Sequence, residues 1–269
     1  MNYKAIFTDL DDTLLNSSGK INPTDKKAIM KCQKKGVKFI LASGRPTFAM
    51  KDLATELELD KYNSYLLSFN GAVVTECSTG KTLFQESLTK DDIHKLYDFS
   101  KEKNLHIITY LDDSIISETT SEYIDVEVNL TKMPHKIVEN FKNTVDRDAI
   151  KCIILGEPTY LKNMEKELKA MYEDIYTIAI SKPFFLEVTK KGIDKGNTLK
   201  RLIKELNIDI KETIAVGDSY NDITMLQAAG LAVAVENAKP EIIKIADYVT
   251  FSNDNNGMAN LIEKYVIQK

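Results

Sequence analysis

Short hydrophobic runs alternate with amphipathic stretches in the first third of the chain. Residues 5–7 are apolar and run into acidic residues, which is typical of a buried parallel strand. Asn22-Pro23 predicts a helix start, because asparagine caps helices and proline suits the first helical position, and Gly36 ends this helix. Apolar runs at 37–42 and 64–69 predict two more strands. The first two strands and their helix form a βαβ unit, which favours a right-handed crossover between parallel strands.

The last third of the chain has the same alternation. Helices are expected at residues 198–206, 223–229 and 259–267, and strands at residues 213–216 and 231–235. The two ends of the chain are therefore expected to build one doubly wound α/β core with a mostly parallel sheet.

The middle of the chain has a different pattern. Helices are expected at 91–103 and 160–172, and strands at 106–110, 114–117, 150–155, 177–180 and 184–188. Neighbouring strands with helices between them indicate an inserted α+β domain. We predict a core of residues 1–82 and 189–269 and an inserted domain of residues 83–188. Connections near residues 81–84 and 189–192 are expected to act as a hinge.

Composition and charge narrow the class of protein. The chain has 269 residues, 43% of them hydrophobic, which is too apolar for a disordered protein. Its 36 basic and 40 acidic residues give a net charge of −4 without a long block of either sign, so neither nucleic acid nor a membrane is expected as a partner. The N-terminus lacks the apolar segment of a signal peptide, and a cytoplasmic location is expected. The cysteines and histidines show no metal-ligand spacing.

Carboxylates follow two of the predicted strands. Asp9 and Asp11 come directly after the first strand, and Asp218 and Asp222 follow the strand at 213–216. The carboxyl ends of parallel strands share one edge of a sheet, so these groups are expected to converge there. Burying them together without a cation would be costly, and oxygen ligands suit Mg²⁺, which we expect as the cofactor. Taken singly, the first motif could be a solvated acidic loop and the second a helix cap.

Hydroxyl and cationic side chains occur at the end of another predicted strand and before a predicted helix. Ser43-Gly44-Arg45 ends the second strand, and Lys195 precedes a predicted helix. Together with the carboxylates they supply a nucleophile, an acid/base, a metal cage and phosphate donors, which are the groups that phosphoryl transfer needs.

The order of these motifs resembles the haloacid dehalogenase (HAD) superfamily of phosphohydrolases. The matching segments are DLDDTLL (9–15), ASGR (42–45), FNGA (69–72), DKG (194–196) and GDSYND (217–222). They are similar to the Cof-type branch, in which a large α/β cap is inserted between the second and third motifs. The resemblance implies a HAD-like core and a cap that selects the substrate.

The resemblance also implies roles for the four carboxylates. Asp9 would be the nucleophile that forms an aspartyl-phosphate, and Asp11 would act first as general acid and then as general base. Mg²⁺ would be held by Asp9, the main-chain carbonyl of Asp11 and Asp218, with Asp222 as a ligand or a support.

Phosphate-binding roles follow from the same resemblance. Ser43 and Lys195 would hold the phosphoryl oxygens, and Lys195 would also counter the carboxylate charge. Asn221 would donate to the phosphate, and Thr13 would steady the nucleophile loop. Further substrate contacts are expected from Gly44, Arg45, Asn70 and Gly71.

These observations predict a Mg²⁺-dependent phosphomonoesterase. Its substrates would be small cytosolic phosphometabolites, such as sugar phosphates or phosphorylated vitamins, and the protein would be a monomer or a weak homodimer. Two alternatives stay open. A phosphomutase would use the same carboxylate pair to move a phosphate within a sugar, and a phospho-accepting signalling domain would also gather carboxylates, Mg²⁺ and a lysine at a sheet edge.

Overall fold

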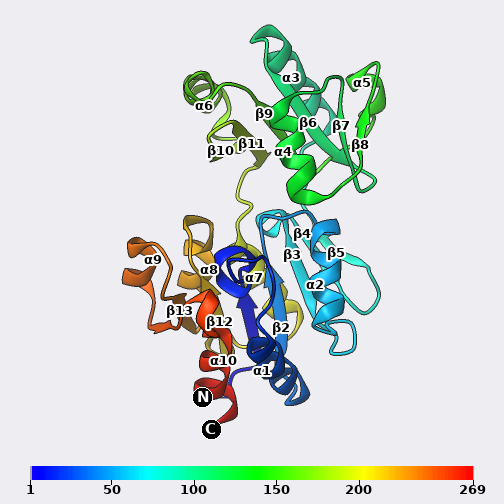
Figure 1. Ribbon diagram of the computed structural model, residues 1–269. Helices are drawn as coiled ribbons and strands as arrows, with labels where there is room; N and C mark the ends of the chain where they lie inside the picture. The colour runs from blue at the N-terminus through cyan, green and yellow to red at the C-terminus, as the bar shows by residue number, and fades with distance from the viewer. Residues whose placement is uncertain (1, 269) are drawn as a thin grey trace. The chain divides into compact units, whose positions relative to one another are not determined.

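The computed structural model describes residues 2–268, which form two compact units (Figure 1). Unit 1 comprises the chain up to residue 84 and from residue 194 onwards, and unit 2 comprises residues 85–193. Among the residues described, no helix has the length and apolar character needed to cross a membrane.

Unit 1 is built on a mostly parallel sheet with the strand order β14-β13-β12-β1-β2-β3-β4-β5. The strands are β1 (Ala5–Thr8), β2 (Lys38–Ala42), β3 (Tyr65–Ser68), β4 (Val73–Glu76), β5 (Thr82–Gln85), β12 (Thr213–Gly217), β13 (Leu231–Val235) and β14 (Tyr248–Thr250). Neighbours from β14 to β3 pair in parallel, whereas β4 runs antiparallel to β3. The predicted α/β fold with a mostly parallel sheet is confirmed. The carboxyl ends of β1, β2 and β12 consequently lie along one edge.

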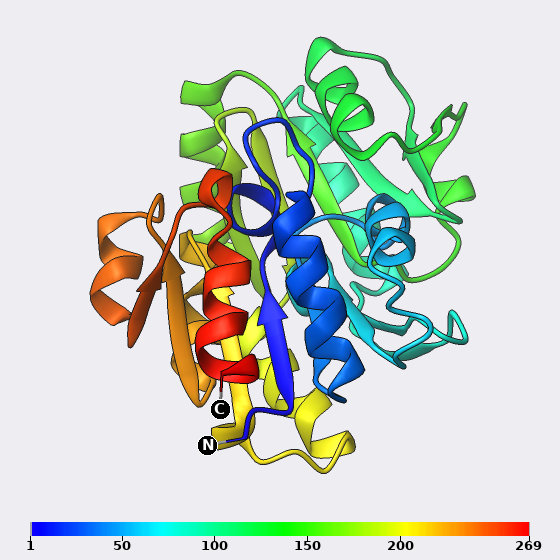
Figure 2. The same cartoon turned by 60° about the horizontal axis from the view of Figure 1, so that its bottom comes forward.

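The helices of unit 1 lie between or after the strands of its sheet along the chain. They are α1 (Pro23–Lys34), α2 (Lys51–Glu56), α7 (Lys195–Glu205), α8 (Ile223–Ala228), α9 (Pro240–Ile245) and α10 (Gly257–Ile262). Figure 2 shows α1 and α10 side by side in front of β1. α7 begins at Lys195 rather than at residue 198, because the Asp194 carboxylate accepts a hydrogen bond from the Asn197 backbone N–H at 2.8 Å and caps the helix.

Unit 2 has a mainly antiparallel sheet with the strand order β10-β11-β9-β6-β7-β8. Its strands are β6 (His106–Leu111), β7 (Ser114–Ser117), β8 (His135–Ile137), β9 (Lys151–Leu155), β10 (Tyr176–Lys182) and β11 (Phe185–Lys190). Its helices are α3 (Lys90–Glu102), α4 (Glu122–Thr131), α5 (Phe141–Thr144) and α6 (Pro158–Tyr172). α3 and α6 contribute to the apolar core that covers one face of the sheet.

Polar side chains are buried on the opposite face of the unit 2 sheet. The Tyr110 hydroxyl donates to Glu127 at 2.5 Å, and the Lys151 ammonium pairs with Glu187 at 3.1 Å. Three of these side chains come from strands, namely Tyr110 from β6, Lys151 from β9 and Glu187 from β11. Their neighbours along each strand face the apolar core, and because successive side chains point to opposite faces, these three face the other side. The second face of this sheet therefore holds a hydroxyl–carboxylate hydrogen bond and an ion pair.

The structure differs from the sequence expectations in the segments expected to form the hinge. Residues 82–84, expected to be a hinge, belong to β5, which lies beside β4 at the end of the sheet. Residues 189–190, expected to belong to the second hinge connection, continue β11 in register with β9 and β10. The chain accordingly passes between the units after residue 84 and again after residue 193.

Candidate active site

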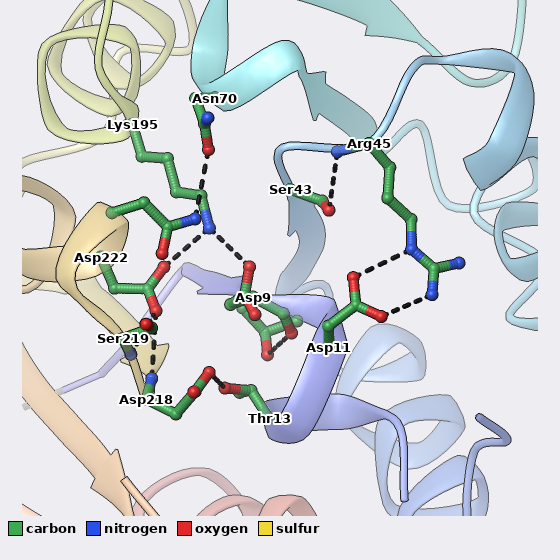
Figure 3. A network of polar contacts seen from close by, with 12 residues as sticks. Asp9, Asp11, Thr13, Ser43, Arg45, Asn70, Lys195, Asp218, Ser219 and Asp222 are labelled. Atoms are coloured by element: carbon green, nitrogen blue, oxygen red, sulfur yellow. Dashed lines mark hydrogen bonds and ion pairs between the residues drawn. The ribbon is translucent and has the colours of Figure 1, made fainter. Parts of the chain in front are cut away.

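Five side chains of unit 1 converge at the carboxyl edge of the sheet (Figure 3). Asp9 follows β1, Ser43 follows β2, Lys195 is the first residue of α7, and Asp218 and Asp222 follow β12. The sheet order places β1 between β2 and β12, so groups from both neighbouring strands meet beside Asp9.

Two glycines allow the close approach of these segments. A Cβ on Gly217 would lie 2.6 Å from the Asp222 side chain, so only glycine lets that carboxylate fold back against the end of β12. A Cβ on Gly196 would lie 2.1 Å from the Thr224 carbonyl oxygen, where α7 and α8 pack together. Gly196 thereby lets the neighbouring Lys195 enter the site.

Lys195 forms the centre of the site. Its ammonium is fully buried and contacts the Asp9 Oδ1 atom at 2.5 Å and the Asp222 Oδ1 atom at 2.7 Å. Burial alone would lower the pKa of Lys195, but the charges and hydrogen bonds of the two carboxylates outweigh burial and raise this pKa above its ordinary value. The two carboxylates in contact with Lys195 therefore favour its charged form.

Asp222 uses both carboxylate oxygens within the protein. Oδ1 contacts Lys195, and Oδ2 accepts hydrogen bonds from the backbone N–H groups of Asp218 and Ser219 at 3.0 and 3.1 Å. These contacts fix the loop after β12 and hold Lys195 toward Asp9. Asp222 thus supports both the loop and Lys195, and its carboxylate also belongs to the oxygen cluster that could hold a metal.

Asp218 belongs to the same loop after β12, and its Oδ1 atom accepts a hydrogen bond from the Thr13 hydroxyl at 2.7 Å. Burial raises the pKa of Asp218 to about 6, against the lowering by the Thr13 hydrogen bond, and the negative charges of Asp222 and Asp12 raise it further. Burial is also the main cause of the raised pKa of Asp9. Burial thus disfavours the ionised forms of Asp9 and Asp218, which a further positive charge would stabilise.

A divalent cation fits this set of groups. Asp9, Asp218 and Asp222 each offer a carboxylate oxygen, and these oxygens lie within 4.8 Å of one another. The single ammonium of Lys195 leaves excess negative charge among them. Carboxylate oxygens are the ligands that Mg²⁺ prefers in proteins, so the donor set suits the expected metal.

The Asp11 side chain faces Arg45. Its carboxylate is 57% exposed and receives a two-pronged contact from Arg45, with Nε donating to Oδ2 at 2.9 Å and the NH2 group donating to Oδ1 at 2.5 Å. Figure 3 shows Arg45 and Lys195 on opposite sides of Asp9. The Arg45 guanidinium, expected to bind substrate, contacts Asp11 in this structure.

The FNGA segment forms a strained turn beside Ser43. Phe69, Asn70 and Gly71 all have positive φ, with values of 51°, 55° and 95°, and a bulky residue such as Phe69 rarely adopts this conformation. Backbone hydrogen bonds from Asn70 to the Ser43 carbonyl and from Phe69 to the Arg45 carbonyl, both 2.9 Å long, hold the turn.

The strained turn presents the Asn70 side chain to two other expected site residues. Asn221 donates to the Asn70 Oδ1 atom at 3.2 Å. A Cβ on Gly44 would lie 3.2 Å from the same atom, so the backbone of the Ser43–Arg45 segment passes closely over Asn70. The structure therefore brings the expected substrate-binding residues Gly44, Asn70 and Asn221 together.

Sequence analysis missed two side chains that contact the turn after Asp9. Asn237 and Asn253 donate to the carbonyls of Asp12 and Leu15 at 2.7 and 2.9 Å. They follow the ends of β13 and β14, the remaining parallel strands on this side of the sheet. Their positions shortly after parallel strands could have identified them, because residues after such strands lie at the same edge of the sheet as Asp9.

Comparisons with known proteins identify the family of this chain. The family model of haloacid dehalogenase-like hydrolases matches residues 6–262. The chain belongs to this family. The predicted resemblance and the predicted enzyme class, a phosphatase of the HAD superfamily, are both confirmed.

Individual HAD-like relatives match over nearly the whole chain. A putative phosphatase of Streptococcus pyogenes is 32% identical over 99% of this chain and 100% of its own length. A 5-amino-6-(5-phospho-D-ribitylamino)uracil phosphatase of Bacillus subtilis is 30% identical over 99% of this chain and 97% of its own length. The crystal structure of a haloacid dehalogenase-like hydrolase from Bacteroides thetaiotaomicron has a TM-score of 0.93 and 33% identity, covering 98% of this chain and 99% of that one.

Proposed function

We propose that this HAD-like hydrolase is a Mg²⁺-dependent phosphomonoesterase that acts on small phosphorylated metabolites in the cytoplasm through an aspartyl-phosphate. The observation that carries the proposal is the arrangement around Asp9, which combines a buried ammonium, nearby carboxylates and a separate exposed carboxylate, Asp11.

In the first half-reaction, the Asp9 carboxylate attacks phosphorus. A bond forms between Asp9 and phosphorus, the bond from phosphorus to the alcohol oxygen breaks, and Asp11 gives that oxygen a proton. Lys195 fixes the orientation of Asp9 and balances part of the negative charge of the site. The Ser43 hydroxyl and the Asn221 amide provide donors for the phosphoryl oxygens.

In the second half-reaction, water attacks the phosphorus of the aspartyl-phosphate. Asp11, now ionised, accepts a proton from that water, and the bond between phosphorus and Asp9 breaks. Inorganic phosphate leaves, and Asp9 regains its carboxylate. Mg²⁺, held by Asp9, Asp218 and the Asp11 carbonyl, would add positive charge against the carboxylates and the phosphoryl group.

The relatives and unit 2 support a proposal for the substrate class. The Bacillus subtilis relative is named for a phosphorylated ribityl chain on a uracil ring, which supports a phosphorylated sugar or sugar alcohol as the substrate of this chain. We propose that unit 2 selects the organic group, because it lies between the second and third motifs and lacks their catalytic residues. The partner is accordingly a small phosphate ester, and we propose that the chain works as a monomer or a weak homodimer.

Release of inorganic phosphate tests the proposed function. With Mg²⁺ present, the purified protein should hydrolyse members of a panel of sugar, sugar-alcohol and vitamin phosphates, and EDTA should remove nearly all of this activity. Excess Mg²⁺ added after EDTA should restore it. An isomeric sugar phosphate formed without free phosphate would favour the phosphomutase, and full activity in EDTA would contradict the metal site.

Arg45 offers a test of the role of Asp11. Arg45 contacts both Asp11 oxygens and so fixes the orientation of this carboxylate. Without that support, Asp11 should transfer a proton less well, and Arg45→Ala should lower kcat/KM about 10- to 100-fold for an alkyl phosphate, whose leaving group needs a proton. The loss for an aryl phosphate with a good leaving group should be a few-fold. The measurement is a kinetic comparison of the two esters.

A double-mutant cycle separates this role from direct phosphate binding by Arg45. If Arg45 works through Asp11, Arg45→Ala should cost little once Asp11→Asn is present. Equal losses in both backgrounds would show that Arg45 contacts the phosphate itself.

A further inference from the structure

The turn that carries Asp11 has an irregular backbone. Within this nucleophile turn (Leu10–Leu14), Asp11 is extended at φ −72° and ψ 128°, and Asp12 is left-handed at φ 59° and ψ 6°. Such a conformation is unfavourable at a residue other than glycine and persists where its surroundings hold it. The chain then makes a small hairpin, in which Leu15 and Ile21 form an antiparallel bridge.

Asn237 contacts the nucleophile turn with its side-chain amide. Its Nδ2 atom donates to the Asp12 carbonyl at 2.7 Å, and its Oδ1 atom accepts from the Asn253 backbone N–H at 3.0 Å. The partners determine the orientation of the amide, because the nitrogen must face the carbonyl and the oxygen must face the N–H. An aspartate at this position could not make the first contact while ionised.

Asn253 holds the start of the hairpin. Its side chain is buried, and its Nδ2 atom donates to the Leu15 carbonyl at 2.9 Å. Its own carbonyl accepts from the Asn22 side chain at 2.7 Å, and the neighbouring Asp254 accepts from the Ser17 backbone N–H at 2.9 Å. The loop after β14 is thus joined to both ends of the hairpin.

We propose that Asn237 and Asn253, called here the amide bracket, are positioning residues that place Asp11 for proton transfer. Asn237 fixes the backbone immediately after Asp11, and Asn253 fixes Leu15, which follows the nucleophile turn. The Asp11 side chain itself is exposed. Asp9 has separate supports, namely Lys195 and a 2.9 Å hydrogen bond from its backbone N–H to the Val216 carbonyl. Loss of the bracket should therefore impair proton transfer more than nucleophilic attack. This inference rests on the proposed function.

The test uses Asn237→Asp, which keeps the shape of the side chain and removes the donor to Asp12. Asn237 is exposed, so the fold should tolerate this change. The matched control is Asn255→Asp, which makes the same change at an exposed residue whose amide contacts Ser252 at 2.9 Å. Two measurements are made on the full chain: hydrogen exchange of the backbone amides of residues 10–21, and kcat and KM for an alkyl and an aryl phosphate.

Asn237→Asp should speed amide exchange in residues 10–21 about tenfold, as expected when a local structure loses one hydrogen bond. It should lower kcat about tenfold for the alkyl ester and about twofold for the aryl ester, with KM within about twofold of the wild-type value. Asn255→Asp should leave both measurements unchanged.

Unchanged exchange in Asn237→Asp would show that the bracket does not hold the turn. Faster exchange with equal kcat losses for both esters would show that the bracket supports the fold without placing Asp11. Either result overturns the proposal while leaving an active wild-type phosphatase. A wild-type protein that releases no phosphate from any ester would instead overturn the proposed function, and the positioning role with it.

Discussion

Asp9→Asn should lower phosphate release by about 10³-fold or more while leaving the fold intact. The amide has nearly the same shape as the carboxylate, but its nitrogen and oxygen do not attack phosphorus as a carboxylate does. Lys195 would keep Asp222 as a charged partner at 2.7 Å, so the buried ammonium would not be left unpaired. The measurement is the rate of phosphate release at saturating Mg²⁺, with circular dichroism to check the fold.

The matched control for this variant is Asp52→Asn, the same change at an exposed position of α2. It should have wild-type activity. Near-normal turnover in Asp9→Asn would disprove the nucleophile assignment. Recovery of a phosphorylated protein from the Asp9→Asn variant, at the wild-type level, would place the phosphoryl group on another residue.

The core of unit 1 could be predicted because its strands are short, uniformly apolar runs. β1, β12 and β13 are buried along their whole length, as strands in the interior of a parallel sheet must be. The expected active-site residues follow from the same pattern, since a parallel sheet brings the residues after its strands to one edge. Asp9 and Asp218 could thus be brought together from positions far apart in the sequence.

Edge strands escaped prediction because burial does not dictate their sequence. β5 is largely exposed, and β14 has three residues with Val249 facing solvent. Neither segment shows the apolar run that identifies the interior strands. Their positions are determined by pairing with β4 and β13, which is a tertiary effect.

The sequence also does not predict which residues the polar and charged side chains of the site contact. The ASGR motif predicts that Arg45 lies near the site but not that its guanidinium meets Asp11, because a long side chain can reach several neighbours. The contact of Asn237 with Asp12 joins residues from opposite ends of the chain. Such contacts depend on the packing of loops, for which a single sequence has no periodic signal.

Lys195→Met should have the second large effect, on stability as well as activity. The buried ammonium separates Asp9 from Asp222, and its removal leaves two carboxylates without a counter-charge. Breaking a buried ion pair by removing one partner costs about 3–5 kcal/mol. In EDTA at pH 8, the free energy of unfolding should fall by about this amount, and phosphate release with Mg²⁺ should fall about 10³-fold or more.

The loss of stability in Lys195→Met should depend on pH in a defined direction. Without the ammonium, the pKa of Asp9, which burial already raises, should rise further in the folded protein, since the lowering by Lys195 is lost while repulsion from Asp222 remains. A carboxyl group whose pKa is raised by folding stabilises the fold at low pH and ceases to do so as pH rises through the folded value. Urea unfolding in EDTA should therefore show a smaller difference from wild type at pH 5 than at pH 8. Lys200→Met, at an exposed position of the same helix, should show little loss at either pH. A difference for Lys195→Met that is equal at both pH values would show that packing, rather than charge, accounts for the effect of this lysine.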